Sequence, residues 1–358
     1  RLEKLKGVTF HQKLGTLHDK VERMVDLTAV LAPTLIVPHD HERVLRCRRA
    51  ALLCKADLLT GMVGEFPTLQ GIMGREYARY DREHDEVACA IAEHYFPRFS
   101  EDTIPSSLAG KILSLADRLD TLAAFFSVGL VPTGSQDPYA LRRHAYAIIR
   151  ILLEGGLSLK LHAFIGHAFD VLKLHKISVS DKADSELALF LLERFRYYCV
   201  AVRNFREDLV EAVALHWWFS DESDPQNLVT RIQALEGFSA RSEFESLVIA
   251  YKRAENITKS QADDKVDDAR LQEDVEKGLY VSVRAAEDVV SGLIKDGKFK
   301  DALEALVALK APIDAFFVGV MVMAEDEAVR RNRRALLVRV RNLFRQYADF
   351  SKVNVEVK

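Results

Sequence analysis

Apolar residues recur at helical spacing along almost the whole chain, and this pattern constrains the fold more than any other feature. Leu336, Val340, Leu343 and Tyr347 repeat every three or four residues, which is the spacing that lines one face of an α-helix. Alternating apolar and polar runs bounded by turn pairs, which are typical of strands, are hard to find. The sequence therefore predicts an all-α fold.

The length and charge of the chain limit both its domain count and its partners. A chain of 358 residues is long enough for two or three domains, since one domain usually takes about 100 to 200 residues. Apolar residues make up 49% of the chain and charged residues 29%, as in ordinary globular proteins. The formal net charge of -3 excludes a uniformly basic nucleic-acid coat but leaves room for local basic patches.

The cysteines and the hydropathy of the chain indicate the cellular compartment in which we expect the protein. Cys47, Cys54, Cys89 and Cys199 form no CxxC pair, which argues against a zinc knuckle or a disulfide framework and fits a reducing cytoplasm. No uninterrupted apolar run approaches the roughly 18 residues that a membrane span requires, so we expect no membrane segment. The chain starts at Arg1 without a methionine, which suggests that an upstream part is missing.

Polar and turn-forming segments suggest where helices and domains end. Asp137 followed by Pro138 predicts a helix start, in which the carboxylate caps free amides and proline takes the first helical position. This helix should run to about Glu154 and stop at the following Gly-Gly pair. A polar joint at 178–185 is expected to separate two domains. The polar segment 258–277 is expected to be an exposed helix or a connection.

A first group of candidate site residues lies in the N-terminal half. Asp57 follows Lys55-Ala56, His94 lies in AIAEHY, and Asp117 lies in SLADRLDTL. HD-domain phosphohydrolases hold a divalent ion with a histidine, a His-Asp dyad and a later aspartate, and this order of residues resembles that layout. Imidazole and carboxylate together bind a metal that activates water. However, Ala56 stands where the dyad needs a histidine, and an alanine cannot bind a metal.

Several interpretations of this group remain open. A degenerate site would keep Asp57, His94 and Asp117 as a buried polar cluster or as salt bridges between helices. His18-Asp19 is a literal His-Asp pair, although the spacing that follows it fits the dyad poorly. A live metal-dependent phosphohydrolase that acts on nucleotides or phosphoesters and recruits other ligands is the competing function.

The segments around these residues resemble a known family in more detail. They read KADLLTGMVGEFPTLQGIMG, EHYFPRF, ADRLDTL and PTGSQDPYALRR, and nearer the C-terminus KRAENI and IDAFFVGVMVMAEDEAVRRNRRALL. In this order they resemble the β subunit of the bacterial heterotetrameric glycyl-tRNA synthetase, over nearly the whole chain. The later motifs are similar to its DALR-type anticodon-binding domain.

This resemblance implies an architecture and a role. We expect an HD-like helical domain with a degenerate metal site at 1–155, a helical connector at 156–185 and a DALR-like helical anticodon-binding domain at 186–358. The chain would bind glycine-specific tRNA within an α2β2 glycine-tRNA ligase and position it for charging by the α subunit. ATP and Mg would be used by the α subunit, and this chain would carry no cofactor, metal or catalytic residue.

Local charge favours RNA contact independently of the resemblance. The segment 330–345 holds seven arginines and no acid, and guanidinium groups match phosphate oxygens. The alternative is a solvated helix whose arginines pair with acids such as Glu325, Asp326 and Glu327. From this segment we predict tRNA contacts by Arg330, Arg331, Arg333, Arg334 and Arg341.

Three further groups of residues could contact RNA. The stretch 194–206 interleaves arginines, including Arg203, with aromatic residues that could stack on unpaired bases, although helical spacing makes most of these aromatics core residues. Lys252, Arg253 and Asn256 fall within about one helical turn, where Asn256 could instead have a structural role at a helix end. A weaker patch combines Arg142, Arg143 and Arg150. A helical scaffold with no RNA role remains a third functional class.

Overall fold

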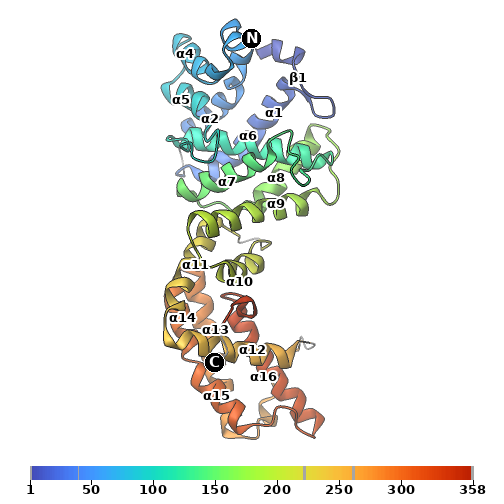
Figure 1. Ribbon diagram of the computed structural model, residues 1–358, viewed down its shortest axis with the longest axis vertical. Helices are drawn as coiled ribbons and strands as arrows, with labels where there is room; N and C mark the ends of the chain where they lie inside the picture. The colour runs from blue at the N-terminus through green and yellow to red at the C-terminus, as the bar shows by residue number, and fades with distance from the viewer. Residues whose placement is uncertain (1, 39, 221–222, 260–262, 356–358) are drawn as a thin grey trace. The chain divides into compact units, whose positions relative to one another are not determined.

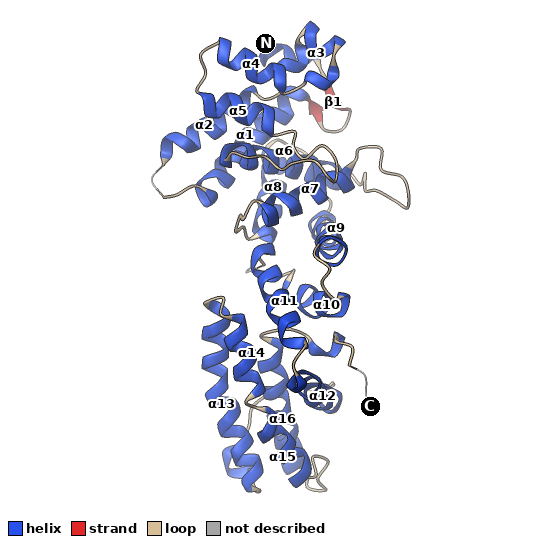
Figure 2. Ribbon diagram, turned by 60° about the vertical axis from the view of Figure 1, so that its left-hand side comes forward, coloured by secondary structure: helices blue, strands red, loops and turns tan. Residues whose placement is uncertain are grey.

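The computed structural model describes residues 2–38, 40–220, 223–259 and 263–355. In these residues it has sixteen α-helices and a single two-stranded hairpin (Figure 1), which confirms the prediction of an all-α fold. Figure 2 shows how little of the chain is strand. The chain divides into two compact units, one formed by Arg1–Tyr198 and Phe219–Gln226 and the other by Cys199–Trp218 and Asn227–Lys358. None of the helices formed by the described residues combines the length and apolar character of a membrane span.

The first unit opens with a 3-10 helix, Leu2–Gly7, and an antiparallel hairpin. Its α-helices and remaining short elements are β1 (Thr9–His11), β2 (Gly15–Thr16), α1 (Leu17–Leu35), α2 (His41–Leu53), the 3-10 helix Ala56–Leu59, α3 (Gly61–Glu65), the 3-10 helix Pro67–Leu69, α4 (Ile72–Tyr80), α5 (Asp85–Glu93), α6 (Leu108–Ser127), α7 (Leu141–Glu154), α8 (Leu161–Leu174) and α9 (Ala183–Tyr197). The hairpin pairs Thr9 with Thr16 and His11 with Gly15.

Helix α6 forms the centre of the first unit. It is buried along almost its entire length and packs against α1, α2, α5, α7, α8 and α9. A helix covered on all sides is normally apolar throughout, yet α6 buries Asp117, Arg118 and Asp120 among leucines and alanines. Because buried charges require partners, these residues must be matched by polar groups from the neighbouring helices.

The second unit is also helical. After a π-helical turn at Tyr198–Val202 its elements are α10 (Glu207–Trp217), α11 (Pro225–Ser239), α12 (Ser242–Thr258), the 3-10 helix Asp268–Arg270, α13 (Asp274–Lys295), α14 (Phe299–Val307), α15 (Lys310–Gly319), α16 (Glu327–Arg345) and the 3-10 helix Phe350–Lys352. The first two residues of α11 belong to the first unit. Helix α16 packs against α12 and α13. A buried aromatic cluster has ring centroids 5.8 to 6.3 Å apart and consists of Tyr251, Phe344, Tyr347 and Phe350.

The first compact unit extends beyond the predicted end of the HD-like domain at residue 155. The segment 156–185, expected to be a connector, contains α8, which packs on α1, α6 and α9. Its apolar residues Phe164, Ile165 and Phe169 are buried, so this segment belongs to the core of the first unit. The polar joint at 178–185, where we expected the domain boundary, precedes and begins α9 inside the same unit.

Two other sequence-based predictions have different outcomes. Asp137 caps free amides as predicted, since its carboxylate accepts from the amides of Leu141 and Arg142 at 2.8 and 3.0 Å. Helix α7, however, begins at Leu141 and not at Pro138, because Ala140 adopts a left-handed conformation (φ 55°). Helix α12 ends at Thr258 and α13 begins at Asp274, so the described part of the predicted polar segment is mostly loop.

Candidate functional site

Two of the three predicted metal-site remnants meet around a lysine. His94 ends α5, Asp117 lies in α6, and the ammonium of Lys55, just after α2, contacts both side chains. Its Nζ lies 2.8 Å from His94 Nε2 and donates to Asp117 Oδ2 at 2.7 Å. The other imidazole nitrogen, Nδ1, lies 2.7 Å from the carbonyl of Ile91. Burial and the Lys55 charge hold the pKa of His94 well below its usual value, so a neutral imidazole donates to Ile91 and accepts from Lys55.

A second lysine completes the partners that the acids of α6 require. Lys20 of α1 pairs with Asp117 at 2.8 Å and with Asp120 at 3.0 Å, and Arg23 pairs with Asp120 at 2.6 Å. Burial alone would raise the pKa of Asp117, but Lys20 and Lys55 hold it well below its usual value. These buried pairs tie α6 to α1 and to the end of α2.

Asp57 does not join this cluster. One oxygen of its carboxylate accepts hydrogen bonds from the amides of Gly71 and Gly74, at 2.6 and 3.1 Å. Burial raises its pKa, although these two amide hydrogen bonds act in the opposite direction. Asp57 therefore fixes the start of α4. Our expectation of one cluster formed by Asp57, His94 and Asp117 is corrected, because the 3-10 turn after Lys55 directs the lysine and the aspartate to different neighbours.

The cluster does not fit a divalent metal. The ammonium of Lys55 stands between His94 Nε2 and Asp117 Oδ2, the two atoms that a metal would need, and its charge repels a cation. Lys55 thus fills the space of a metal, and the structure gives no support to the phosphohydrolase alternative. The sequence shows a lysine, Lys55, directly before Ala56, but its partners His94 and Asp117 lie 39 and 62 positions away along the chain.

The alternative His-Asp pair serves the start of a helix. Asp19 Oδ2 accepts from the backbone amide of Thr16 at 2.7 Å, and Thr16 Oγ1 accepts from the amide of Asp19 in return. These reciprocal bonds form the capping box at the N-terminus of α1. Among the described residues, His18, Asp19 and Glu22 offer ligand atoms within 4.8 Å of one another, on a partly exposed surface.

The arginines of α16 differ from the cationic face that we expected. Arg333 is buried and bonds to Glu276, which is fully buried, and to the carbonyl of Met321. Arg341 is also buried and donates to the carbonyl of Thr258 at 2.9 Å. Arg339 pairs with Glu287. Because α16 lies against α12 and α13, most of its guanidinium groups are used inside the unit and do not form one solvated face.

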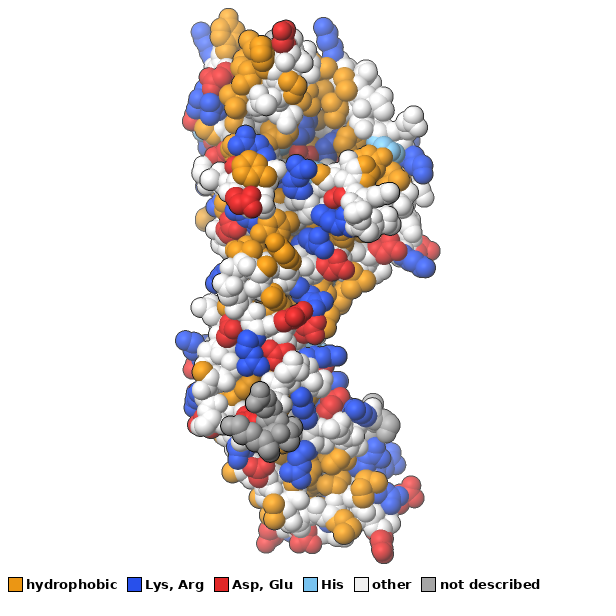
Figure 3. Space-filling model, viewed as in Figure 1, with side chains coloured by type: hydrophobic (Ala, Val, Ile, Leu, Met, Phe, Trp, Pro, Cys, Tyr) orange, Lys and Arg blue, Asp and Glu red, His pale blue; other side chains and the backbone are white. Residues whose placement is uncertain are grey.

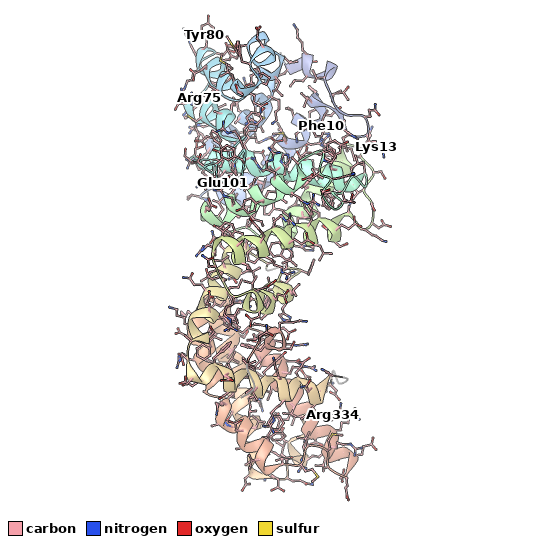
Figure 4. All side chains as sticks on the ribbon, in the orientation of Figure 1. Phe10, Lys13, Arg75, Tyr80, Glu101 and Arg334 are labelled. Carbon is pink, nitrogen blue, oxygen red and sulfur yellow. The ribbon has the colours of Figure 1, made fainter. Side chains whose placement is uncertain are left out.

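The N-terminal end of α16 remains more accessible. The side chain of Arg331 is 74% exposed and lies 3.3 Å from Asp263. Arg330 is half-buried and donates to the carbonyl of Ala324, and Arg334, labelled in Figure 4, is also half-buried. Asp326 caps this end by accepting from the amides of Ala328 and Val329.

The other predicted RNA contacts vary in accessibility. Lys252 is half-buried and its Nζ donates to the carbonyl of Val353 at 2.7 Å, whereas Arg253 and Asn256 on the same helix are exposed. The guanidinium of Arg253 lies 4.1 Å from the ring centre of Phe317. Arg203 is exposed and stacks near Phe205 at 5.4 Å. Figure 3 shows basic and acidic side chains interspersed on the visible face of each unit.

The aromatic and basic stretch 194–206 is divided between the two compact units. Arg194 and Tyr197 belong to the first unit and line a groove there, together with Phe99, Arg142, Arg143 and Tyr146. Phe195 and Tyr198 are buried, as helical spacing suggested. Arg150, from the weaker patch, pairs with Glu154 at 2.7 Å and is buried.

Family models match both parts of the chain. A model described as the glycyl-tRNA synthetase beta subunit matches residues 1–215. A second model, described as a DALR anticodon binding domain, matches residues 247–354, which include most of α12 and all of α13 to α16 and lie within the second compact unit.

Curated relatives agree with these matches. Glycine-tRNA ligase beta subunits from Trichlorobacter lovleyi and Geobacter metallireducens are 42% and 43% identical to this chain over 353 and 357 residues, covering 99% of it and 50% of each relative. The corresponding protein of Myxococcus xanthus is 42% identical over 363 residues, covering 99% of this chain and 51% of its own length. The chain thus spans about half the length of the curated relatives it matches. With one family model over residues 1–215 and relatives of this identity over nearly every residue, the chain belongs to the glycyl-tRNA synthetase beta subunit family.

Proposed function

We propose that this chain binds glycine-specific tRNA as the non-activating subunit of a cytoplasmic glycine-tRNA ligase. The observation that carries the proposal is the match of residues 247–354 to an anticodon-binding model, on a chain whose relatives are named glycine-tRNA ligase beta subunits. The charge of the accessible residues in this region is compatible with that role. The free thiols Cys47, Cys54, Cys89 and Cys199 fit a reducing compartment.

The accessible basic residues of the second unit define the RNA-facing part of the proposal. Arg253 on α12 and Arg331 on α16 are exposed, and these two helices pack against each other. Arg203 is exposed as well. Guanidinium groups in solvent can bind phosphate oxygens in a forked geometry and release counterions. Asn256, exposed one turn from Lys252, can add an amide contact to a base or a sugar.

The catalytic contribution of the chain is then positional. Glycine activation, with ATP and Mg, belongs in this proposal to the α subunit, and the two chains assemble as an α2β2 complex. Binding energy at the anticodon end of tRNA is far from the reacting ester, but it orients the substrate and lowers the barrier there. We assign no residue of this chain to contact with glycine or ATP.

Titration of the chain with glycine tRNA at several salt concentrations tests the RNA-binding proposal. We expect log Kd to depend steeply on log salt, and Arg331→Ala or Arg253→Ala to weaken binding and to reduce the slope by about 1 each. Arg75→Ala is the matched control, because Arg75 is a surface arginine on α4 that pairs with Glu76. A flat salt response, or equal losses in Arg331→Ala and Arg75→Ala, would overturn the proposal.

Assembly and charging test the second part of the proposal. We expect the mass of the complex with the α subunit, measured by light scattering, to correspond to two copies of each chain. Charging of glycine tRNA should fall in the Arg331→Ala variant through a raised KM for tRNA, while the glycine-dependent exchange of pyrophosphate into ATP stays constant. A loss of that exchange in the variant would contradict the assignment of activation to the α subunit.

A further inference from the structure

The Lys55 cluster lines a cavity that the proposed role in tRNA binding does not use. The cavity has a volume of about 450 Å³, within the range of roughly 300 to 1,000 Å³ that small-molecule sites occupy. It lies wholly within the first unit, between the hairpin, α1, α6 and α7. Its charged lining consists of one carboxylate and five basic residues, namely Asp117 with Lys20, Lys55, Arg98, Arg118 and Arg143.

The buried charges around this cavity do not balance. Lys20, Arg23, Lys55 and Arg118 are buried there, whereas the buried acids of α6 are Asp117 and Asp120. This leaves two excess positive charges, and one if Asp57 is counted as ionised. The guanidinium of Arg118 donates to the carbonyls of His94, Tyr95 and Pro97 at 2.8 to 3.0 Å. Carbonyls satisfy its donors but do not neutralise its charge, so an anion in the cavity would be stabilised.

Two buried polar atoms of lining residues also lack a partner. Tyr95 Oη and His144 Nδ1 are shielded from solvent and have no hydrogen-bond partner among the described residues. Burial lowers the pKa of His144 to about 3, so its imidazole is neutral and can donate or accept. Unsatisfied buried groups cost free energy until they are paired, and both atoms belong to side chains of the cavity lining.

Aromatic side chains form another part of the cavity lining. Phe10 of β1, labelled in Figure 4, Phe125 of α6 and Tyr139 line the cavity. The rings of Phe125 and Tyr139 lie 4.2 Å apart, and Phe10 meets Phe125 edge-on at 5.9 Å. Tyr139 is 38% exposed, so part of its ring is available for stacking. A lining that combines cationic and aromatic side chains is suited to a ligand that joins a phosphate to a planar base.

We propose that this cavity binds a nucleoside monophosphate, with its phosphate near Lys55, Arg118 and Arg143 and its base against Tyr139. Binding involves no hydrolysis, because Lys55 takes the place of a metal. The ammonium of Lys55 donates one hydrogen bond to His94 and one to Asp117. Its third N–H is left to donate to the phosphate. Arg143 is exposed at the cavity and its one hydrogen bond among the described residues is to the carbonyl of Arg98 at 3.3 Å, so its charge is available to the phosphate.

Equilibrium dialysis of the chain with labelled adenosine monophosphate tests the site. We expect saturable binding of one nucleotide per chain, competition by inorganic phosphate, and binding of adenosine at least about tenfold weaker. Arg143→Ala and Lys55→Met should each raise Kd about tenfold, as expected when a charge-assisted hydrogen bond is lost. Arg143→Ala is the decisive variant, since an exposed side chain can be removed without disturbing the fold.

Arg142→Ala is the matched control, because Arg142 neighbours Arg143 on α7 but does not line the cavity and bonds to the carbonyl of Gly134 at 2.7 Å. It should bind the nucleotide like the unchanged chain, and so should Arg331→Ala in the other unit. Equal Kd values for Arg143→Ala and Arg142→Ala would overturn the site. Two results would overturn the assigned ligand. One is adenosine binding as tightly as the monophosphate, and the other is a cavity that binds RNA but no free nucleoside monophosphate.

Discussion

The substitution Arg333→Met separates a structural arginine of α16 from one that faces RNA. Arg333 bonds to Glu276, whose side chain is fully buried. Removing one partner of a buried ion pair costs about 3 to 5 kcal/mol, because the other charge stays buried. Glu276 keeps two hydrogen bonds, from the amides of Gln272 and Glu273 at 2.6 and 2.8 Å. We therefore expect a loss at the lower end, about 3 kcal/mol, or about 6 to 12 °C in Tm for a unit of this size.

Thermal unfolding followed by circular dichroism, with a separate transition for each compact unit, measures this loss. Combining Arg333→Met with Glu276→Gln removes the uncompensated charge and should restore at least about 1 kcal/mol. Arg331→Ala, two residues away and largely exposed, should change stability by less than about 0.5 kcal/mol. An Arg333→Met variant that keeps its Tm but loses tRNA affinity as Arg331→Ala does would refute the structural role of Arg333.

Three other outcomes follow from the buried groups and the helix caps. Folding depresses the pKa of Asp117, so the stabilisation from its carboxylate is fully present above the unfolded pKa of 3.8 and is lost as pH falls through the folded pKa. In Lys55→Met, acid unfolding monitored by circular dichroism should therefore begin at higher pH. An unchanged acid midpoint would contradict the pairing of Lys55 with Asp117. Cys89 is the one cysteine of the four that is not buried, so iodoacetamide at pH 8 should alkylate one thiol per chain faster than the other three, and Cys89→Ser should remove this phase; a faster phase that survives this change would count against the buried positions of the others. Asp326→Ala should cost about 1 kcal/mol in urea unfolding, because the cap of α16 is lost, whereas no loss would show that other groups satisfy these amides.

The helical class and several helix ends follow from local sequence alone. Apolar spacing predicted helices throughout the chain, and Asp137 and Asp326 cap the helices that follow them. These features depend on residues within one or two turns of each other, so they are visible in the sequence. The extent of the first unit was not, because whether α8 packs on α6 or links two domains depends on contacts far along the chain.

The predicted metal-site remnants likewise combine a feature that is visible in the sequence with contacts that only the tertiary structure reveals. Ala56 alone indicated that the His-Asp dyad is broken, and His94 and Asp117 were recognised as neighbours. Lys55 occupies the space between them, while Asp57 bonds to the amides at the start of α4. This arrangement could be seen only once the positions of α5 and α6 around the turn after α2 were known. The cavity beside them was invisible in the sequence because its walls come from the hairpin and from helices distant along the chain.

The arginines of α16 show most clearly what the sequence alone could not determine. The sequence determined that this helix carries seven guanidinium groups and one apolar stripe, and therefore that it needs either acids or phosphates as partners. Only the tertiary structure decided which: Glu276 and Glu287 on α13 and Glu255 on α12 pair with Arg333, Arg339 and Arg345, and exposure remains chiefly at Arg331. An opposite charge offsets the cost of burying a guanidinium group, and for these arginines that partner is set by helix packing between segments 52 to 90 residues apart.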